Sequence, residues 1–236
     1  MLNFKHALEI QHFFYAKNTM EHLTLIETTI NFVKEKLADA EGGHDWFHIE
    51  RVHKNTLLIA KEENCDLLVC ELGALLHDIA DSKFHGGDET VGPKTARDFL
   101  EKENVSEEII QHVVKIIENI SFKGGNFEKN FDSIELDIVQ DADRLDAIGA
   151  IGIARCFNYG GFKNRALYNP EILPNLSMTK EEYKNTNSPT VNHFYEKLLL
   201  LKDKMKTITG KKIAEQRHLY MEGFLEQFFA EWEGKR

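Results

Sequence analysis

Residues 74–89 read ALLHDIADSKFHGGDE and place His77 and Asp78 at the end of an apolar run. The run belongs to a helix expected from about Asp66 to Ile79, which is apolar enough to lie at the centre of the protein. Burying an imidazole and a carboxylate costs free energy unless hydrogen bonds or a metal ion compensate the loss of water. The stretch therefore predicts a central helix that ends at a polar network or at a metal centre.

Helical periodicity extends to both sides of this stretch. Apolar residues recur at helical spacing from Glu21 onward, and Gly42-Gly43 ends that helix because glycine adopts left-handed dihedrals at low cost. A second helix begins near Asp45, and Gly92-Pro93 marks another start, where the missing proline donor costs nothing. Further helices are expected over four ranges: 107–120, 133–157, 187–207 and 211–232. Strand signals are weak, so the sequence predicts an all-α fold.

The same pattern sets the expected domain organisation. We expect a single domain over residues 1–236, with a helical core at about 21–160. A polar loop at 158–186 and added C-terminal helices at 187–232 are expected to cover the site. Residues 1–19 are interpreted as an extra arm before the core, and an upstream start is the alternative.

Composition narrows the class of protein. The 236 residues include 42% hydrophobic and 29% charged residues, and the formal net charge is −10. This balance is typical of a globular protein and argues against binding to a nucleic-acid polymer. No apolar run approaches membrane-spanning length, and the amino terminus lacks the apolar core of a signal peptide. Cys65, Cys70 and Cys156 form no CxxC pair, which is typical of free thiols in a reducing cytoplasm. We therefore expect a cytoplasmic protein without a membrane partner.

Four stretches place histidines and acids where a helical core does not favour them. The residues are His44 and His48; His77, Asp78 and Asp81; Asp141, Asp143 and Asp146; and His193. His44 and His48 lie four residues apart and therefore share one helix face. The alternative is structural, because Asp141 or Asp146 could pair with Arg144 or Lys163. We give a structural interpretation to the other helical histidines: His6, His12, His22, His53, His112 and His218.

Imidazoles and carboxylates together indicate the kind of ion. They suit divalent Mn, Fe, Co, Ni or Zn, whereas Mg prefers an all-oxygen shell. No cysteine lies in the four stretches, which argues against a thiolate zinc site. Two histidines and two aspartates leave positions open on an octahedral ion, where water and a phosphate oxygen can bind together. We expect one divalent metal ion as cofactor, with Mn favoured.

The motifs HIERV, LLHDIAD and QDADRLDA follow the order H…HD…D, which resembles the HD-domain superfamily of metal-dependent phosphohydrolases. The match covers about residues 40–160. A fuller pattern is similar to the small bacterial HD nucleotide pyrophosphohydrolases: GGHDWFHIERV, HDIADSKFHGGDETVGP, IENISFKGG and DADRLDAIGAIGIAR. The resemblance implies a single all-α HD domain, here with added C-terminal helices.

This resemblance implies four metal ligands: His48, His77, Asp78 and an aspartate of DADRL. The family motif favours Asp143 over Asp141 as the fourth ligand. Residues two apart on a helix point about 200° away from each other, so one of the two aspartates can face the ion but not both.

Further roles follow from the same resemblance. Asp81, three residues past the HD pair, is the candidate general base or water-orienting group. His44 is the second catalytic candidate, as an acid for the leaving phosphate or as a phosphate contact, with helix capping or packing as the alternative. Asp146, Glu89 and Glu118 are candidates for supporting the ligands from behind. Glu89 and Glu118 stand where dinuclear members carry histidines, so the resemblance implies a mononuclear site.

Phosphoryl chemistry depends on positioning and on charge neutralisation, so cations are expected near the metal. The candidates for substrate binding are Arg51, Lys83, Lys123, Arg144, Lys163, Arg165 and His193. The resemblance implies a hydrolase in which metal-activated water attacks a nucleoside triphosphate and releases a monophosphate and pyrophosphate. The alternatives are a phosphodiesterase or 5′-nucleotidase on the same site, and a non-catalytic module that senses nucleotides or metal. The expected partner is a small phosphorylated substrate, and a homodimer is compatible with the sequence.

Overall fold

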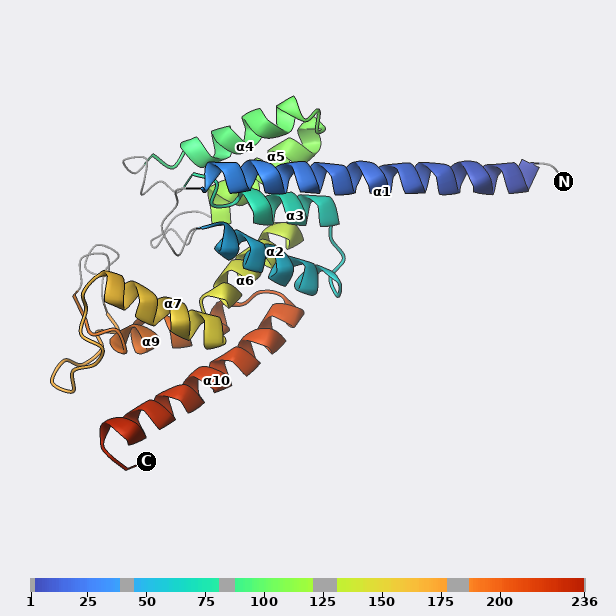
Figure 1. Ribbon diagram of the computed structural model, residues 1–236. Coiled ribbons are helices and arrows are strands. Elements are labelled where there is room, and N and C mark those ends of the chain that lie inside the picture. Colours follow the sequence, from blue (N-terminus) through green and yellow to red (C-terminus); the bar gives the residue numbers. More distant parts are fainter. Residues whose placement is uncertain (1–2, 39–44, 81–87, 121–130, 178–186, 236) are drawn as a thin grey trace.

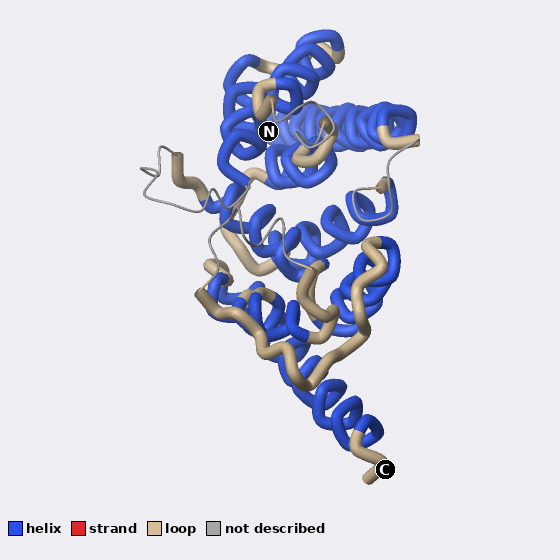
Figure 2. Tube along the Cα trace, turned by 90° about the vertical axis from the view of Figure 1, so that its left-hand side faces the viewer, coloured by secondary structure: helices blue, strands red, loops and turns tan. Residues whose placement is uncertain are grey.

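The computed structural model describes residues 3–38, 45–80, 88–120, 131–177 and 187–235. These residues form helices joined by loops, and none of them lies in a β-strand (Figure 1 and Figure 2). The all-α fold predicted from the sequence is therefore confirmed. Within the same residues, none of the helices combines the length and the apolar character that crossing a membrane requires.

Helix α3 (Leu67–Leu76) is the centre of the core. The side chain of Asp66 caps the helix by accepting a hydrogen bond from the backbone N of Val69. Every residue from Val69 to Leu76 is buried, as the apolar run predicts. The helices packed against α3 are α1 (Asn3–Lys36), α2 (Trp46–Ala60), α5 (Glu107–Ile120) and α6 (Ile134–Asp146). Helix α4 (Val91–Lys102) packs on α5 at the outer side.

Helix α1 is longer than the sequence predicts. It begins at Asn3 instead of near Glu21, so the expected arm continues the first helix. Its second half packs on the core through the buried residues Ile26 and Val33, whereas its first half projects away from the other helices (Figure 1). The helix ends at Lys36, and the Gly42-Gly43 pair expected to end it lies outside the described residues.

The range 133–157, expected as one helix, forms two. Two residues, Ala147 and Ile148, separate the end of α6 from the start of α7 (Gly149–Phe162). Gly149 has a φ of 73°, and a Cβ atom on Gly152 would lie 2.2 Å from the carbonyl oxygen of Ala147. Only glycine fits such a closed corner. The prediction of one helix is wrong because apolar residues continue across the corner while the glycines permit the chain to turn.

The range 187–207, also expected as a helix, contains only short helical elements. They are α9 (Asn192–Glu196) and the 3-10 turns η2 (Leu198–Leu200) and η3 (Lys202–Lys204). The backbone N–H groups of Lys206 and Thr207 donate to the buried carboxylate of Asp141 instead of to helix carbonyls. This prediction is wrong because an acceptor that is distant in the sequence satisfies the donors.

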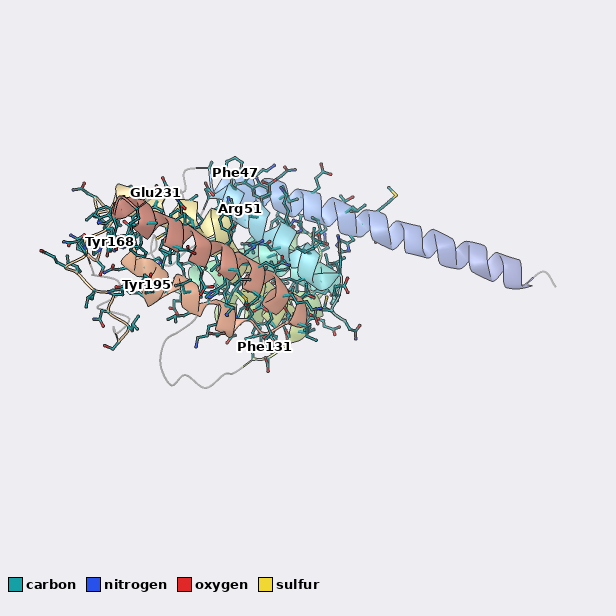
Figure 3. All side chains as sticks on the ribbon, turned by 90° about the horizontal axis from the view of Figure 1, so that it is seen from below. Phe47, Arg51, Phe131, Tyr168, Tyr195 and Glu231 are labelled. Atoms are coloured by element: carbon teal, nitrogen blue, oxygen red, sulfur yellow. The ribbon has the colours of Figure 1, made fainter. Side chains whose placement is uncertain are left out.

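The last helix completes a C-terminal layer, which we define as α7, α9 and α10 (Ile208–Trp232) with the loops between them (Figure 1). Phe157, Phe194 and Phe224 pack together at centroid distances of 5.9 Å, so this layer has an aromatic core of its own. Both α7 and α10 contact α6. In the view from below, Tyr168 and Tyr195 lie at the far end of the layer from Arg51 of α2 (Figure 3).

Candidate metal centre

His48 lies in the first turn of α2, with only 2% of its surface exposed. Asp45 starts the helix, because its side chain accepts a hydrogen bond from the backbone N of His48. The ring Nδ1 lies 2.8 Å from Oδ2 of Asp146. An ionised carboxylate only accepts hydrogen bonds, so Nδ1 carries a proton, and in the neutral imidazole Nε2 then presents a lone pair.

His77 follows the last residue of α3 and is 7% exposed. Its Nδ1 lies 2.8 Å from the carbonyl oxygen of Ala74, one turn earlier in the chain. A carbonyl oxygen also only accepts, so Nδ1 donates and Nε2 again presents a lone pair. The two histidines therefore use one ring nitrogen for support and leave the other as an electron-pair donor.

These two Nε2 atoms face carboxylates across gaps that are too long for hydrogen bonds. The Nε2 of His48 lies 3.5 Å from Oδ1 of Asp143 and 3.9 Å from Oδ2 of Asp78. The Nε2 of His77 lies 4.0 Å from the same Oδ1 of Asp143. Two imidazole nitrogens and two carboxylates therefore converge on one region. Such a cluster is stable when a cation lies between its members.

The spacing of these atoms fits a metal ion. Ligand atoms about 2.1 Å from an ion and at right angles to each other are about 3 Å apart. His48, His77 and Asp78 each offer one ligand atom, and the three atoms lie within 4.8 Å of one another. Over the described ranges, this is the one trio of His, Cys, Asp or Glu residues with that spacing. The cluster is therefore a candidate site for a divalent ion.

The two aspartates that compete for the fourth ligand position face different parts of the protein. Asp143 faces both histidines, and 40% of its side chain is exposed. Asp141 is fully buried and accepts hydrogen bonds from Arg144, from the backbone N of Lys206, and from the backbone N and Oγ1 of Thr207. Because Asp141 is used to hold the start of α10, the geometry supports Asp143 as the fourth ligand.

Asp146 supports His48 from behind and is itself held by two arginines. Nε of Arg51 donates to Oδ1 at 2.6 Å, and Nη2 of Arg51 donates to Oδ2 at 3.0 Å. Arg155 of α7 donates to Oδ2 through Nη1. Burial alone would raise the pKa of Asp146, but hydrogen bonds from His48 and Arg51 and the charge of Arg155 hold it well below its usual range. The carboxylate therefore stays ionised behind His48.

Two of the three arginines predicted to bind substrate, Arg51 and Arg144, contact the protein itself. Arg51 holds Asp146, and this hydrogen bond raises the pKa of the guanidinium. Arg144 donates to the carbonyl oxygen of Lys204 at 3.0 Å and to Asp141 at 3.3 Å. Both side chains thus stabilise the surroundings of α6.

Three further substrate candidates lie in the C-terminal layer. Lys163 lies over the rings of Tyr159 and Phe162, and Arg165 lies over Tyr159. Burial lowers the pKa of His193 to about 4, and nearby cations that include Arg165 add to this effect. These residues form a group of aromatic rings and cations around the end of α7.

Six candidates from the sequence analysis remain. Glu89 and Glu118, predicted to support the ligands, have exposed side chains. His44, Asp81, Lys83 and Lys123 lie outside the described residues. Their predicted roles stay predictions.

Sequence reasoning missed two arginines that join the C-terminal layer to α6. Arg155 reaches Asp146, and Arg217 of α10 donates to the carbonyl oxygen of Leu145 and to Oδ1 of Asn55. Arg155 belongs to the motif DADRLDAIGAIGIAR, but the expectation of a continuous helix placed it far from Asp146. The two glycines of that motif are the signal that could have indicated a turn back.

Comparison with known proteins gives a consistent result. Residues 46–148 match the family model of the HD domain. The uncharacterized protein YpgQ of Bacillus subtilis (strain 168) is 38% identical over 216 residues, which cover 88% of this chain and 94% of YpgQ. The crystal structure of an HD-superfamily hydrolase from Bacillus thuringiensis superposes with a TM-score of 0.73 at 46% identity, covering 90% of this chain and 98% of that one.

A crystal structure of YpgQ in complex with ADP is also similar, with a TM-score of 0.70 and 33% identity. It covers 88% of this chain and 95% of the YpgQ chain. Identities of 33% to 46% over nearly the whole length of these relatives indicate a common family as well as a common fold. The chain belongs to the HD-domain superfamily of hydrolases and is close to YpgQ.

Proposed function

We propose that the protein hydrolyses a phosphorus–oxygen bond of a nucleotide, with one divalent ion held by His48, His77, Asp78 and Asp143. The observation that carries the proposal is the convergence of the Nε2 atoms of two histidines and of two carboxylates, with Nε2–carboxylate separations of 3.5 to 4.0 Å. A purely structural network would place a proton between such groups at hydrogen-bonding distance. Membership of the HD hydrolases supports the class of reaction.

The nucleotide is proposed on a different ground. The related YpgQ has been crystallised with ADP, which supports a ligand that combines phosphates with a nucleoside. The motif resemblance adds the finer proposal that a triphosphate is cut to a monophosphate and pyrophosphate. Cations are then required to neutralise the phosphates, and we propose Lys83, Lys123, Lys163, Arg165 and His193 for this role.

The donor set suits a transition-metal ion better than Mg, and we propose Mn as the ion that supports activity. When bound, the ion would polarise a phosphate oxygen and activate the water that attacks phosphorus. The protein's part is to hold both imidazoles with Nε2 unprotonated, which the Nδ1 donations to Asp146 and Ala74 achieve. Asp81 is proposed to orient or deprotonate the water, and His44 to contact the leaving phosphate.

The test is a product assay with the purified full chain. The apo protein is incubated with Mn²⁺ and a panel of nucleoside triphosphates, diphosphates and monophosphates, a cyclic nucleotide and a dinucleotide. Pyrophosphate, orthophosphate and the nucleotide products are measured separately. We expect pyrophosphate from a triphosphate, and no release after chelation.

The other outcomes of this assay distinguish the alternatives. Orthophosphate from monophosphates would favour a 5′-nucleotidase, and cleavage of a cyclic or dinucleotide substrate would favour a phosphodiesterase. Nucleotide binding without any product, measured by calorimetry on the same sample, would favour a sensing module and would overturn the proposed hydrolysis. The homodimer and the cytoplasmic location stay predictions, for which sedimentation and cell fractionation are the measurements.

A further inference from the structure

Arg155 of α7 contacts the carboxylate of Asp146, which lies behind His48, and the sequence did not predict this contact. Nη1 of Arg155 donates to Oδ2 of Asp146, lies 3.3 Å from the backbone oxygen of Asp146 and lies 3.3 Å from Nδ1 of His48. Asp146 is 1% exposed, and about 29% of the Arg155 side chain is exposed. A charged group from the C-terminal layer therefore lies within van der Waals reach of a proposed metal ligand.

This contact acts on the position of the proton of His48. Oδ2 of Asp146 accepts from His48, from Arg51 and from Arg155, while Oδ1 accepts from Arg51. The hydrogen bonds from the two arginines fix the carboxylate of Asp146 in the place where it accepts from Nδ1 of the imidazole. A carboxylate behind a ligating histidine fixes the ring orientation and tautomer and strengthens the ligand.

The position of Arg155 depends on the corner between α6 and α7. Gly152 approaches the carbonyl oxygen of Ala147 more closely than any residue with a Cβ could. This closed corner turns α7 so that its second turn passes the end of α6, and Arg155 meets Asp146 nine residues after it in the sequence. The C-terminal layer also carries Lys163, Arg165 and His193, which we propose to bind the substrate. The corner therefore connects the proposed metal ligands with the proposed substrate-binding residues.

We propose that Arg155 is a positioning residue of the metal centre, which holds Asp146 against Nδ1 of His48 and makes α7 part of the metal-binding machinery. The inference deepens the proposed function and rests on it for any effect on turnover. Its effects on metal affinity and on the tautomer of His48 are measured without substrate. The failure of one proposal is therefore distinguishable from the failure of the other.

The test compares three variants of one residue with a matched control. Arg155→Met removes the charge and the donors, Arg155→Gln retains an N–H donor without the charge, and Arg155→Lys retains the charge. The control is Arg217→Met, because Arg217 also joins the C-terminal layer to the end of α6 and acts on Asp146 through its charge alone, while its hydrogen bonds go to Leu145 and Asn55. Co²⁺ affinity and the visible spectrum of the Co²⁺ protein are measured, and the tautomer of His48 in the metal-free protein is read by long-range ¹H–¹⁵N NMR.

We expect Arg155→Met to lower Co²⁺ affinity about tenfold, to change the Co²⁺ spectrum, and to raise the fraction of the Nε2–H tautomer of His48. Arg155→Lys should recover much of the affinity, and Arg155→Gln should resemble the Met variant and serve in its place if that variant does not fold. Arg217→Met should lower the melting temperature and leave the spectrum and the tautomer as in the wild type. Wild-type affinity, spectrum and tautomer in the Met and Gln variants would overturn the inference, as would equal effects from Arg217→Met.

Discussion

Among the described residues, two clusters combine a pair of histidines with at least one carboxylate, and their geometries differ. In the metal centre, the Nε2 atoms of His48 and His77 lie 3.5 to 4.0 Å from the facing carboxylate oxygens. In the second cluster, which we call the Glu71 clamp, Nε2 of His22 lies 2.6 Å from one oxygen of Glu71, and Nε2 of His53 lies 2.9 Å from the other. The clamp joins α1, α2 and α3, and Glu71 is 8% exposed.

The difference lies in where the second nitrogen of each ring is used. Behind the metal centre, Asp146 and Ala74 accept the Nδ1 protons, so the atoms that face the carboxylates have none to share. In the clamp, Nε2 itself supplies the proton to Glu71. The same residue types thus form a candidate ion site in one place and a hydrogen-bonded joint in the other, and the acceptor behind the ring differs between them. The hydrogen-bond acceptor behind a histidine ring is therefore as important for its role as the histidine itself.

The largest difference between the two clusters is expected when one histidine is removed from each. His77→Ala should abolish metal binding and turnover, with a loss of affinity of roughly a hundredfold or more, because a ligand is lost and not only its support. His53→Ala is the matched control, and it should leave the metal content unchanged. Metal analysis of both purified variants, with stability measured in parallel, checks this. Full metal content in His77→Ala would count against the ligand assignment.

A second change separates metal binding from chemistry. Asp81→Asn should retain the metal and lose roughly a hundredfold in turnover, because an amide cannot accept a proton from the attacking water. The measurements are metal content and the rate of pyrophosphate release at saturating Mn²⁺. Undiminished hydrolysis would remove Asp81 from the mechanism.

A substitution in the Glu71 clamp should change the free energy of unfolding and not the metal affinity. Glu71→Ala removes the acceptor for both histidines in a buried place, and we expect a cost of about 2 kcal/mol in the free energy of unfolding. Metal affinity should stay at the wild-type value. Urea denaturation and Co²⁺ titration of the same preparation test both statements, and a parallel loss of metal affinity would show that the two clusters are coupled.

The smallest expected effect is a pH dependence that belongs to the clamp. Burial would raise the pKa of Glu71, but hydrogen bonds from His53 and His22 outweigh it, so the pKa lies below its ordinary value of 4.5. A lowered carboxyl pKa contributes stability above the unfolded-state value, and this contribution is lost as the pH falls through the folded-state value. The stability advantage of the wild type over Glu71→Gln should therefore shrink as the pH falls below about 4.5. Thermal unfolding of both metal-free proteins from about pH 6 to pH 3 measures it, and a constant difference would contradict it.

Much of the helical core could be predicted because its signals are local. Asp45 and Asp66 cap the helices that were expected to start beside them, and the range 107–120 is helical as predicted. His22 and His53 were interpreted as structural, and their hydrogen bonds to Glu71 confirm it. Local capping and apolar spacing act within a few residues, so a sequence displays them directly.

The remainder depends on partners that are distant in the sequence. Asp141 and Asp143 were not separable by pattern alone, because what distinguishes them is the start of α10, which donates to Asp141. The break between α6 and α7 depends on a close backbone approach at Gly152. Arg155 could be associated with Asp146 only after this break was known. The residue types of the candidate site could thus be predicted from the sequence, but the distant residues that hold them in place could not.

The segment that matches the family model, residues 46–148, contains all four proposed ligands but ends before the residues that donate to two buried carboxylates of α6. Excising it as a minimal fragment would cut away Arg155 and the amides of Lys206 and Thr207. Two interior carboxylates, Asp146 and Asp141, would then lose donors that offset their desolvation, at a cost of several kcal/mol. Engineering that transplants this site into another scaffold should therefore carry α7 and the beginning of α10 along with it.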